Sequence, residues 1–130
     1  MIITNNPSVI TKFSNHYHII NLYGKNYLDI LLKARDFVHK GHTLLTHPLS
    51  GSIKPNETPF KSIVLTLQST SFDFKSLEII ESSILTTKKL LQDSRTPIYS
   101  EKIIDDFALI DFNLIKSGIE SIIQFSNPII

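Results

Sequence analysis

Short apolar runs separated by turn-forming residues predict several strands in the first half of the chain. Ile2–Thr4 is followed by Asn5-Asn6-Pro7, which ends a strand because proline cannot donate to a ladder and asparagine favours turns. Residues 17–23 are rich in β-branched and aromatic side chains. Residues 43–46 and 62–67 are further apolar runs of strand length. Residues 8–15, between the first two runs, fit one or two helical turns.

Helical spacing is clearest between Asn26 and Gly41. Asn26 and Asp29 are placed as a capping pair, with the acid where the helix dipole favours negative charge. Lys40 and Gly41 are typical of a helix C-terminus. One face of this predicted helix is apolar, and it consists of Tyr27, Ile30, Leu31, Ala34, Phe37 and Val38.

The C-terminal half is predicted to be largely helical. Asp73 can cap a helix to about Leu91, whose inward stripe comprises Leu77, Ile80, Ile84, Leu91 and the stem of Lys88. Thr96-Pro97 ends it. From 100 to 123 two interpretations are open. One is a continuous helix; the other has a break near residues 107–111 and a new helix capped by Asp111, with Leu114, Ile115, Ile119 and Ile122 facing inward.

This order of elements predicts one small α/β domain over residues 1–130, with helices flanking a mainly parallel sheet of about four strands. An antiparallel orientation is open to the 62–67 strand, because no crossover helix precedes it. Ligands of parallel sheets bind outside the carboxyl ends of the strands. We therefore expect Asn5, Asn6 and the loop that begins at His47 to share one rim of the sheet.

Composition narrows the function classes. The 130 residues are 42% hydrophobic and 19% charged, with a formal net charge of +1 and no cysteine. Thiol chemistry and disulfides are excluded, and two arginines without a basic stripe argue against nucleic acid binding. No targeting segment or membrane span is visible. We expect a cytoplasmic protein with no cofactor. The net charge is +4 over residues 1–61 and −3 over residues 62–130, so a site for an anionic ligand is expected in the first half rather than the second.

The loop from His47 to Lys61 is the candidate site. It is rich in proline and long for a connection without secondary structure in a compact domain, which favours a functional role for the loop. Ser50-Gly51-Ser52 offers hydroxyls and backbone N–H groups around a glycine that tolerates positive φ, as in an anion-binding nest. The alternative interpretation of this segment is a surface loop whose polar side chains form hydrogen bonds within local turns. The predicted ligand-binding residues are Asn5, Asn6, Thr46, His47, Ser50, Gly51, Ser52, Lys54, Asn56 and Lys61.

All five histidines lie between His16 and His47. His16 and His18 would share one face of a strand, yet no third metal ligand is fixed by spacing, so we predict no metal site. His39 is explained by the dipole of a helix C-terminus. His47 is the best catalytic candidate, as an acid or base near neutral pH. The aspartates 105, 106 and 111 are expected to be caps or to lie on a solvated helix face.

Three segments carry a resemblance to the GrdX family. They are Arg35–Ser62, which includes His39-Lys40-Gly41-His42-Thr43-Leu44-Leu45-Thr46-His47-Pro48-Leu49-Ser50-Gly51-Ser52, the opening Ile2–Pro7, and Asp105-Asp106-Phe107 with Ile110-Asp111. The members of this family are small proteins of anaerobic bacteria, encoded beside the glycine, sarcosine or betaine reductase system. The resemblance therefore implies a genomic context for the protein, but it implies no catalytic residues.

The sequence therefore leaves three hypotheses. The first is an accessory protein of amino-acid reductive fermentation that binds a small anionic ligand at the 47–61 loop, with no activity established. The second is a non-enzymatic partner or assembly factor of the glycine reductase components. The third is a small hydrolase or transferase that uses His47. A homo-oligomer is compatible with all three.

Overall fold

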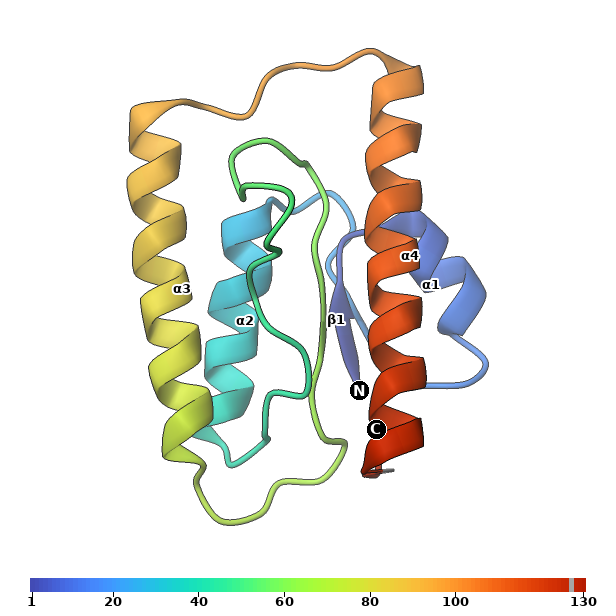
Figure 1. The fold of residues 1–130 in the computed structure, drawn as a ribbon, viewed down its shortest axis with the longest axis vertical. Helices are drawn as coiled ribbons and strands as arrows, with labels where there is room; N and C mark the ends of the chain where they lie inside the picture. Colours follow the sequence, from blue (N-terminus) through green and yellow to red (C-terminus); the bar gives the residue numbers. More distant parts are fainter. Residues whose placement is uncertain (127) are drawn as a thin grey trace.

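A computed structural model describes residues 1–126 and 128–130, and over these the chain forms three strands and four helices (Figure 1). In chain order they are β1 (Ile2–Thr4), α1 (Pro7–Phe13), β2 (Ile19–Asn21), α2 (Tyr27–His39), β3 (Ser62–Val64), α3 (Phe74–Asp93) and α4 (Glu101–Phe125). The α/β class and the largely helical C-terminal half are confirmed. No described helix is both long enough and apolar enough to cross a bilayer.

The sheet is mixed, with strand order β2-β1-β3. β1 pairs with β2 in parallel, with Ile3 opposite Ile20, and with β3 in antiparallel orientation, with Ile3 opposite Ile63. The expectation of a mainly parallel sheet of about four strands is therefore corrected to three strands in the described part of the chain, one pairing being antiparallel. The antiparallel orientation left open for the 62–67 strand is the one observed.

The missing strand is the segment 43–46, which lies beside β3 but forms only an isolated bridge, Leu44 with Leu65. Its ladder is interrupted by a side chain. The backbone N–H of Leu45 donates to the Val64 carbonyl at 2.8 Å, but the N–H of Val64 donates to the Thr46 hydroxyl at 2.9 Å. Because a hydroxyl replaces a backbone carbonyl there, regular pairing does not extend to Thr46.

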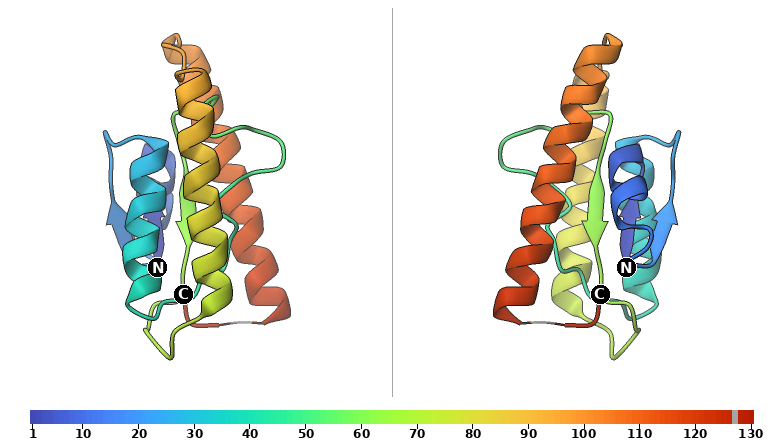
Figure 2. Two further views of the ribbon diagram at one scale, coloured as in Figure 1. Left: turned by 90° about the vertical axis from the view of Figure 1, so that its left-hand side faces the viewer. Right: turned by 90° about the vertical axis from the view of Figure 1, so that its right-hand side faces the viewer.

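The two faces of the sheet build two apolar clusters. Ile3 and Ile63 face α2 and α3, while Ile2 and Val64 face α1 and α4. This alternation follows the two-residue period of a strand. The three layers are visible in Figures 1 and 2, where α2 and α3 lie on one side of β1 and α1 and α4 lie on the other.

The helix termini follow the predicted caps. Asn26 and Asp29 form a reciprocal capping box at α2, and the Asp73 carboxylate accepts from the Ser76 N–H at α3. α4 is one continuous helix, capped by Ser100. Of the two interpretations of residues 100–123, the structure therefore selects the continuous helix, and Asp111 lies in its middle rather than at a cap.

The predicted inward stripes are confirmed in part. Ile80 and Ile84 of α3 are buried, Leu77 and Leu91 are half-buried, and Lys88 is exposed. The remaining buried positions of this face are small and polar: Ser76, Ser83 and Thr87. In α4, Ile115 and Ile119 are buried and Ile122 packs against them, but Leu114 is 46% exposed.

Candidate functional site

The segment from His47 to Lys61 crosses the space between α3 and α4, where Figure 1 shows it as a folded green loop. Side chains hold it at both ends. The Tyr27 hydroxyl donates to the Pro48 carbonyl at 2.8 Å, the Tyr99 hydroxyl donates to the Glu57 carbonyl at 2.7 Å, and the Asn5 amide donates to the Pro59 carbonyl at 2.9 Å. The loop is therefore fixed to three separate parts of the fold although it has no secondary structure of its own.

A pocket of about 410 Å³ lies between the beginning of this loop and α4. Half of the ten predicted ligand-binding residues line it: Thr46, His47, Ser50, Gly51 and Lys61. A smaller pocket of about 20 Å³ shares Ser50, Lys61, Asp111 and Leu114 with it and continues toward Tyr27. The structure thus brings together the strand-exit, loop and lysine positions that the sequence had suggested for one site.

Asp111 anchors a buried polar network beside the pocket. Its carboxylate accepts hydrogen bonds from the Ser62 N–H at 3.1 Å, the Ser62 hydroxyl at 2.7 Å and the Asn6 amide at 2.9 Å. The Thr4 and Ser62 hydroxyls are 2.7 Å apart, which joins the end of β1 to the same network. Burial raises the pKa of Asp111, and these hydrogen bonds together with the charge of Lys61 oppose the shift.

Lys61 is the basic residue of the pocket. Its side chain is buried, and its Nζ lies 5.9 Å from the centre of the Tyr27 ring, within the range of a cation–π contact. Burial lowers the pKa of Lys61, and the nearby carboxylate of Asp111 partly restores it. The Lys61 backbone N–H donates to the Asn5 side chain at 2.9 Å, which fixes the start of the lysine side chain.

His47 lies at the mouth of the pocket and is exposed. Its Nδ1 accepts a hydrogen bond from the Leu49 N–H at 3.0 Å. In the neutral imidazole the proton therefore lies on Nε2, which leaves Nε2 as a donor to a bound group.

The other predicted residues lie elsewhere. Asn6 is fully buried, where it caps α1 and donates to the Ala108 carbonyl of α4, so it supports the fold rather than a ligand. Asn5 bridges residues 25 and 59. The Asn56 amide donates to the carbonyls of Leu90 and Ser94 at the end of α3. The Lys54 N–H donates to Glu57, and the side chain of Lys54 is exposed.

The predicted nest is not formed. The positive-φ glycines of the described chain are Gly24 and Gly41, so Gly51 does not have the left-handed conformation that such a nest requires. The Ser50 hydroxyl instead accepts from the Ser52 N–H, closing the kind of local turn that was the alternative for this segment. The shared rim is also only partial, since Asn5 meets the end of the loop at residues 59–61 rather than its beginning.

The remaining histidines are dispersed. His16 and His18 are exposed, His39 ends α2 with its Nε2 4.0 Å from Glu81, and His42 Nδ1 lies 2.8 Å from the Thr66 carbonyl. Among the residues that the structure describes, no group of three or more His, Asp or Glu side chains could hold a metal ion.

Asp111 and Ser62 are the site residues that the sequence analysis missed, because Asp111 was expected to be a cap or to lie on a solvated face. A signal existed. Ala108, Asp111, Ile115 and Ile119 are spaced by three and four residues, so they share one helix face. An acid in the middle of an otherwise apolar face is one that the fold buries and pairs.

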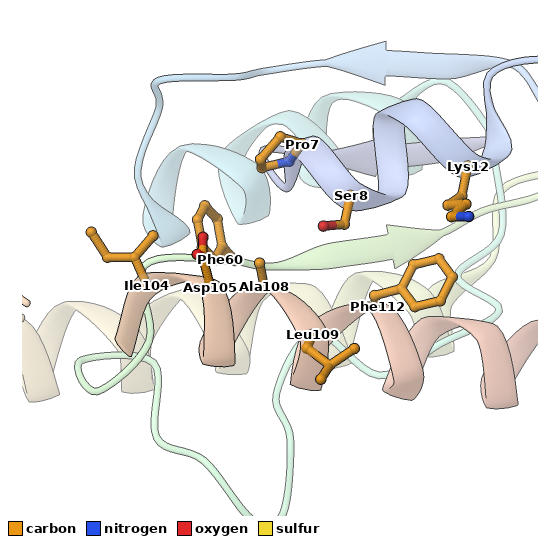
Figure 3. Close-up of a pocket in the computed structure, with 9 residues that line it drawn as sticks. All are labelled: Pro7, Ser8, Lys12, Phe60, Ile104, Asp105, Ala108, Leu109 and Phe112. Carbon is orange, nitrogen blue, oxygen red and sulfur yellow. The ribbon is translucent and has the colours of Figure 1, made fainter. Parts of the chain in front are cut away.

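A third pocket, of about 380 Å³, lies between α1 and α4 (Figure 3). Ala108, Phe112 and Phe60 give it an apolar lining, and the figure shows Lys12 and Asp105 toward its opposite ends. None of the predicted ligand-binding residues lines it.

The comparisons with known proteins identify the family. No curated protein and no solved structure matches the chain significantly. A family model described as GrdX-like protein matches residues 1–120 of the 130. The resemblance seen in three segments of the sequence is thereby confirmed over nearly the whole chain, and the protein belongs to the GrdX-like family.

Proposed function

We propose that the protein binds a small anionic ligand in the pocket between the 47–61 loop and α4, as an accessory protein of amino-acid reductive fermentation. The observation that carries this proposal is the state of Lys61. It brings a positive charge into a pocket that opens to solvent, and within the described residues its ammonium group donates no hydrogen bond to the protein.

Asp111, next to Lys61, differs from it because its side chain does form hydrogen bonds with the protein. Three protein donors already occupy the Asp111 carboxylate, so its hydrogen-bonding capacity is largely used within the fold. The Lys61 ammonium nitrogen is not among the buried side-chain atoms that lack a hydrogen-bond partner, so it reaches the water of the pocket. A ligand oxyanion can replace this water as the acceptor, because a hydrogen bond between two charged groups is stronger than one between neutral groups.

Neutral donors around the pocket suit the same ligand. The Ser50 hydroxyl and the His47 imidazole lie on the loop side. Each can donate to a second oxygen of a carboxylate or phosphate held by Lys61. Because the Tyr27 hydroxyl fixes the loop at Pro48, these groups are positioned before a ligand arrives.

Titration calorimetry with acetate, inorganic phosphate and adenosine monophosphate tests the proposal. We expect binding of at least one of these anions, and loss of that binding in Lys61→Gln. The matched control is Lys54→Gln, which removes an exposed lysine of the same loop outside the pocket and should leave affinity unchanged. Flat titrations with a folded sample, or equal effects of the two substitutions, would refute the site.

A further inference from the structure

The pocket's lining points to a narrower class of ligand than an anion in general. We infer that the ligand is a monocarboxylate with an aliphatic chain, whose carboxylate meets Lys61 and whose chain lies along α4. This inference rests on the proposed function, and it specifies which chemical group the ligand has at each of its two ends.

The charges of the pocket favour a single negative charge on the ligand. Among the described residues, Lys61 is the only lysine or arginine that lines the pocket, and Asp111 lies beside it. A phosphate dianion or a nucleotide brings two or more negative charges and would be repelled by the Asp111 carboxylate. A carboxylate brings one negative charge, so it is repelled less by Asp111 than a dianion is.

Much of the remaining lining of the pocket is aliphatic. It is formed by Leu45 and Leu49 from the loop segment and by Leu114, Ile115 and Ile122 from α4. Leu114 is 46% exposed, so part of this wall is apolar surface in contact with water. An inorganic anion leaves that surface wet, whereas an alkyl chain covers it at a gain of about 25 cal/mol per Å².

α4 approaches the segment before the loop closely at Gly118, which lines the pocket. A Cβ built on this glycine would lie 3.3 Å from Cγ2 of Thr46, so the helix and this segment are already in contact there. A volume of about 410 Å³ is near the lower end of the usual range for small-molecule pockets, roughly 300–1,000 Å³. The chain is therefore a short one.

A homologous series distinguishes this inference from the broader proposal. We would titrate the isotopically labelled protein with acetate, butanoate, hexanoate, inorganic phosphate and hexanol, following backbone amide shifts by NMR. Each buried methylene should tighten binding about fourfold, since it contributes about 0.8 kcal/mol. Hexanoate should therefore bind far more tightly than acetate, and more tightly than phosphate or hexanol.

The other outcomes separate the two claims. Equal affinities of acetate and hexanoate, or tighter binding of phosphate, would overturn the inference and leave the anion site standing. Equal affinities of hexanol and hexanoate would overturn both, because the negative charge would then contribute nothing. Absence of shifts at the pocket residues with every compound would also overturn both.

Paired variants test the aliphatic wall directly. Leu114→Asn should flatten the dependence of affinity on chain length. Leu109→Asn is the matched control, because Leu109 is a 57% exposed leucine of the same helix that lines the other pocket. Both positions are exposed enough for the variants to fold, which thermal melts would verify. Equal chain-length dependence in the two variants would count against the placement of the chain along Leu114.

Discussion

Asn6 and Asp111, 105 residues apart in the sequence, are joined by a 2.9 Å hydrogen bond from the Asn6 amide nitrogen to a carboxylate oxygen. The same asparagine caps α1 through its side-chain oxygen and donates to the Ala108 carbonyl. One fully buried side chain thus fixes the end of β1, the start of α1 and the middle of α4. Because α4 forms one wall of the proposed ligand pocket, this contact also sets the position of that wall.

Asn6→Asp tests this junction. Aspartate preserves the acceptor that caps α1 but replaces the amide donor with a second carboxylate beside Asp111. Like charges at hydrogen-bond distance in a buried site should lower the free energy of unfolding at pH 7 by more than about 2 kcal/mol. Stability should recover partly toward pH 4, as one carboxylate takes up a proton. Urea denaturation at the two pH values measures this, and a loss independent of pH would contradict the charge explanation.

Asp111 should itself give the wild-type protein a pH dependence of defined sign. Burial raises its pKa in the folded state, so between the unfolded value of about 3.9 and the folded value the native protein binds more protons. The contribution of Asp111 to stability is therefore fully present below the unfolded pKa and is lost as pH rises through the folded pKa. Asp111→Asn should remove this component from the slope of stability against pH.

The same carboxylate should respond to the charge of Lys61. Because the ammonium lowers the pKa of Asp111, Lys61→Gln should raise that pKa further. Titration of the Asp111 carboxyl carbon by NMR measures the shift directly. An unchanged midpoint would show that the two charges do not interact, which would also remove the electrostatic argument against a dianionic ligand.

Tyr27→Phe should loosen the loop at the pocket. It removes the hydrogen bond from the hydroxyl to the Pro48 carbonyl, at a cost of about 1 kcal/mol, and leaves the ring beneath Lys61 in place. We expect a modest fall in melting temperature together with weaker ligand binding. Tyr99→Phe is the control, since it releases the loop at Glu57, which does not line the pocket. Its stability should fall while binding is preserved.

Gly118 and Thr46 should be energetically coupled. Alanine favours the helix over glycine by about 1 kcal/mol, but the added Cβ would lie 3.3 Å from Thr46 Cγ2. The Thr46 hydroxyl is bound to the Val64 N–H, so the methyl group cannot rotate away without losing that bond. Gly118→Ala should therefore stabilise the wild type little and the Thr46→Ser protein by nearly the full amount. A double-mutant cycle from denaturation curves measures the coupling, and strict additivity would contradict it.

The sequence by itself determined what depends on neighbours along the chain. Asn26 with Asp29, and Asp73, are local caps, and α2 and α3 begin where these residues predict. Ile2 and Ile3 are consecutive apolar residues, which predicts a strand buried on both faces, and the two side chains do enter different apolar clusters. The choice of the 47–61 loop also came from local composition, and five predicted residues of the strand exit and loop do line one pocket.

What only the tertiary structure decided depends on partners far along the chain. The periodicity of apolar residues could not show that the Thr46 hydroxyl would accept a hydrogen bond from the Val64 N–H and so keep residues 43–46 out of the sheet. Nor could it show that Asp111 is buried against Ser62, 49 residues earlier, and thereby turns an expected surface acid into part of a site. Burying polar groups is tolerated only where hydrogen-bond partners meet them. Packing brings those partners together, and local spacing does not reveal them.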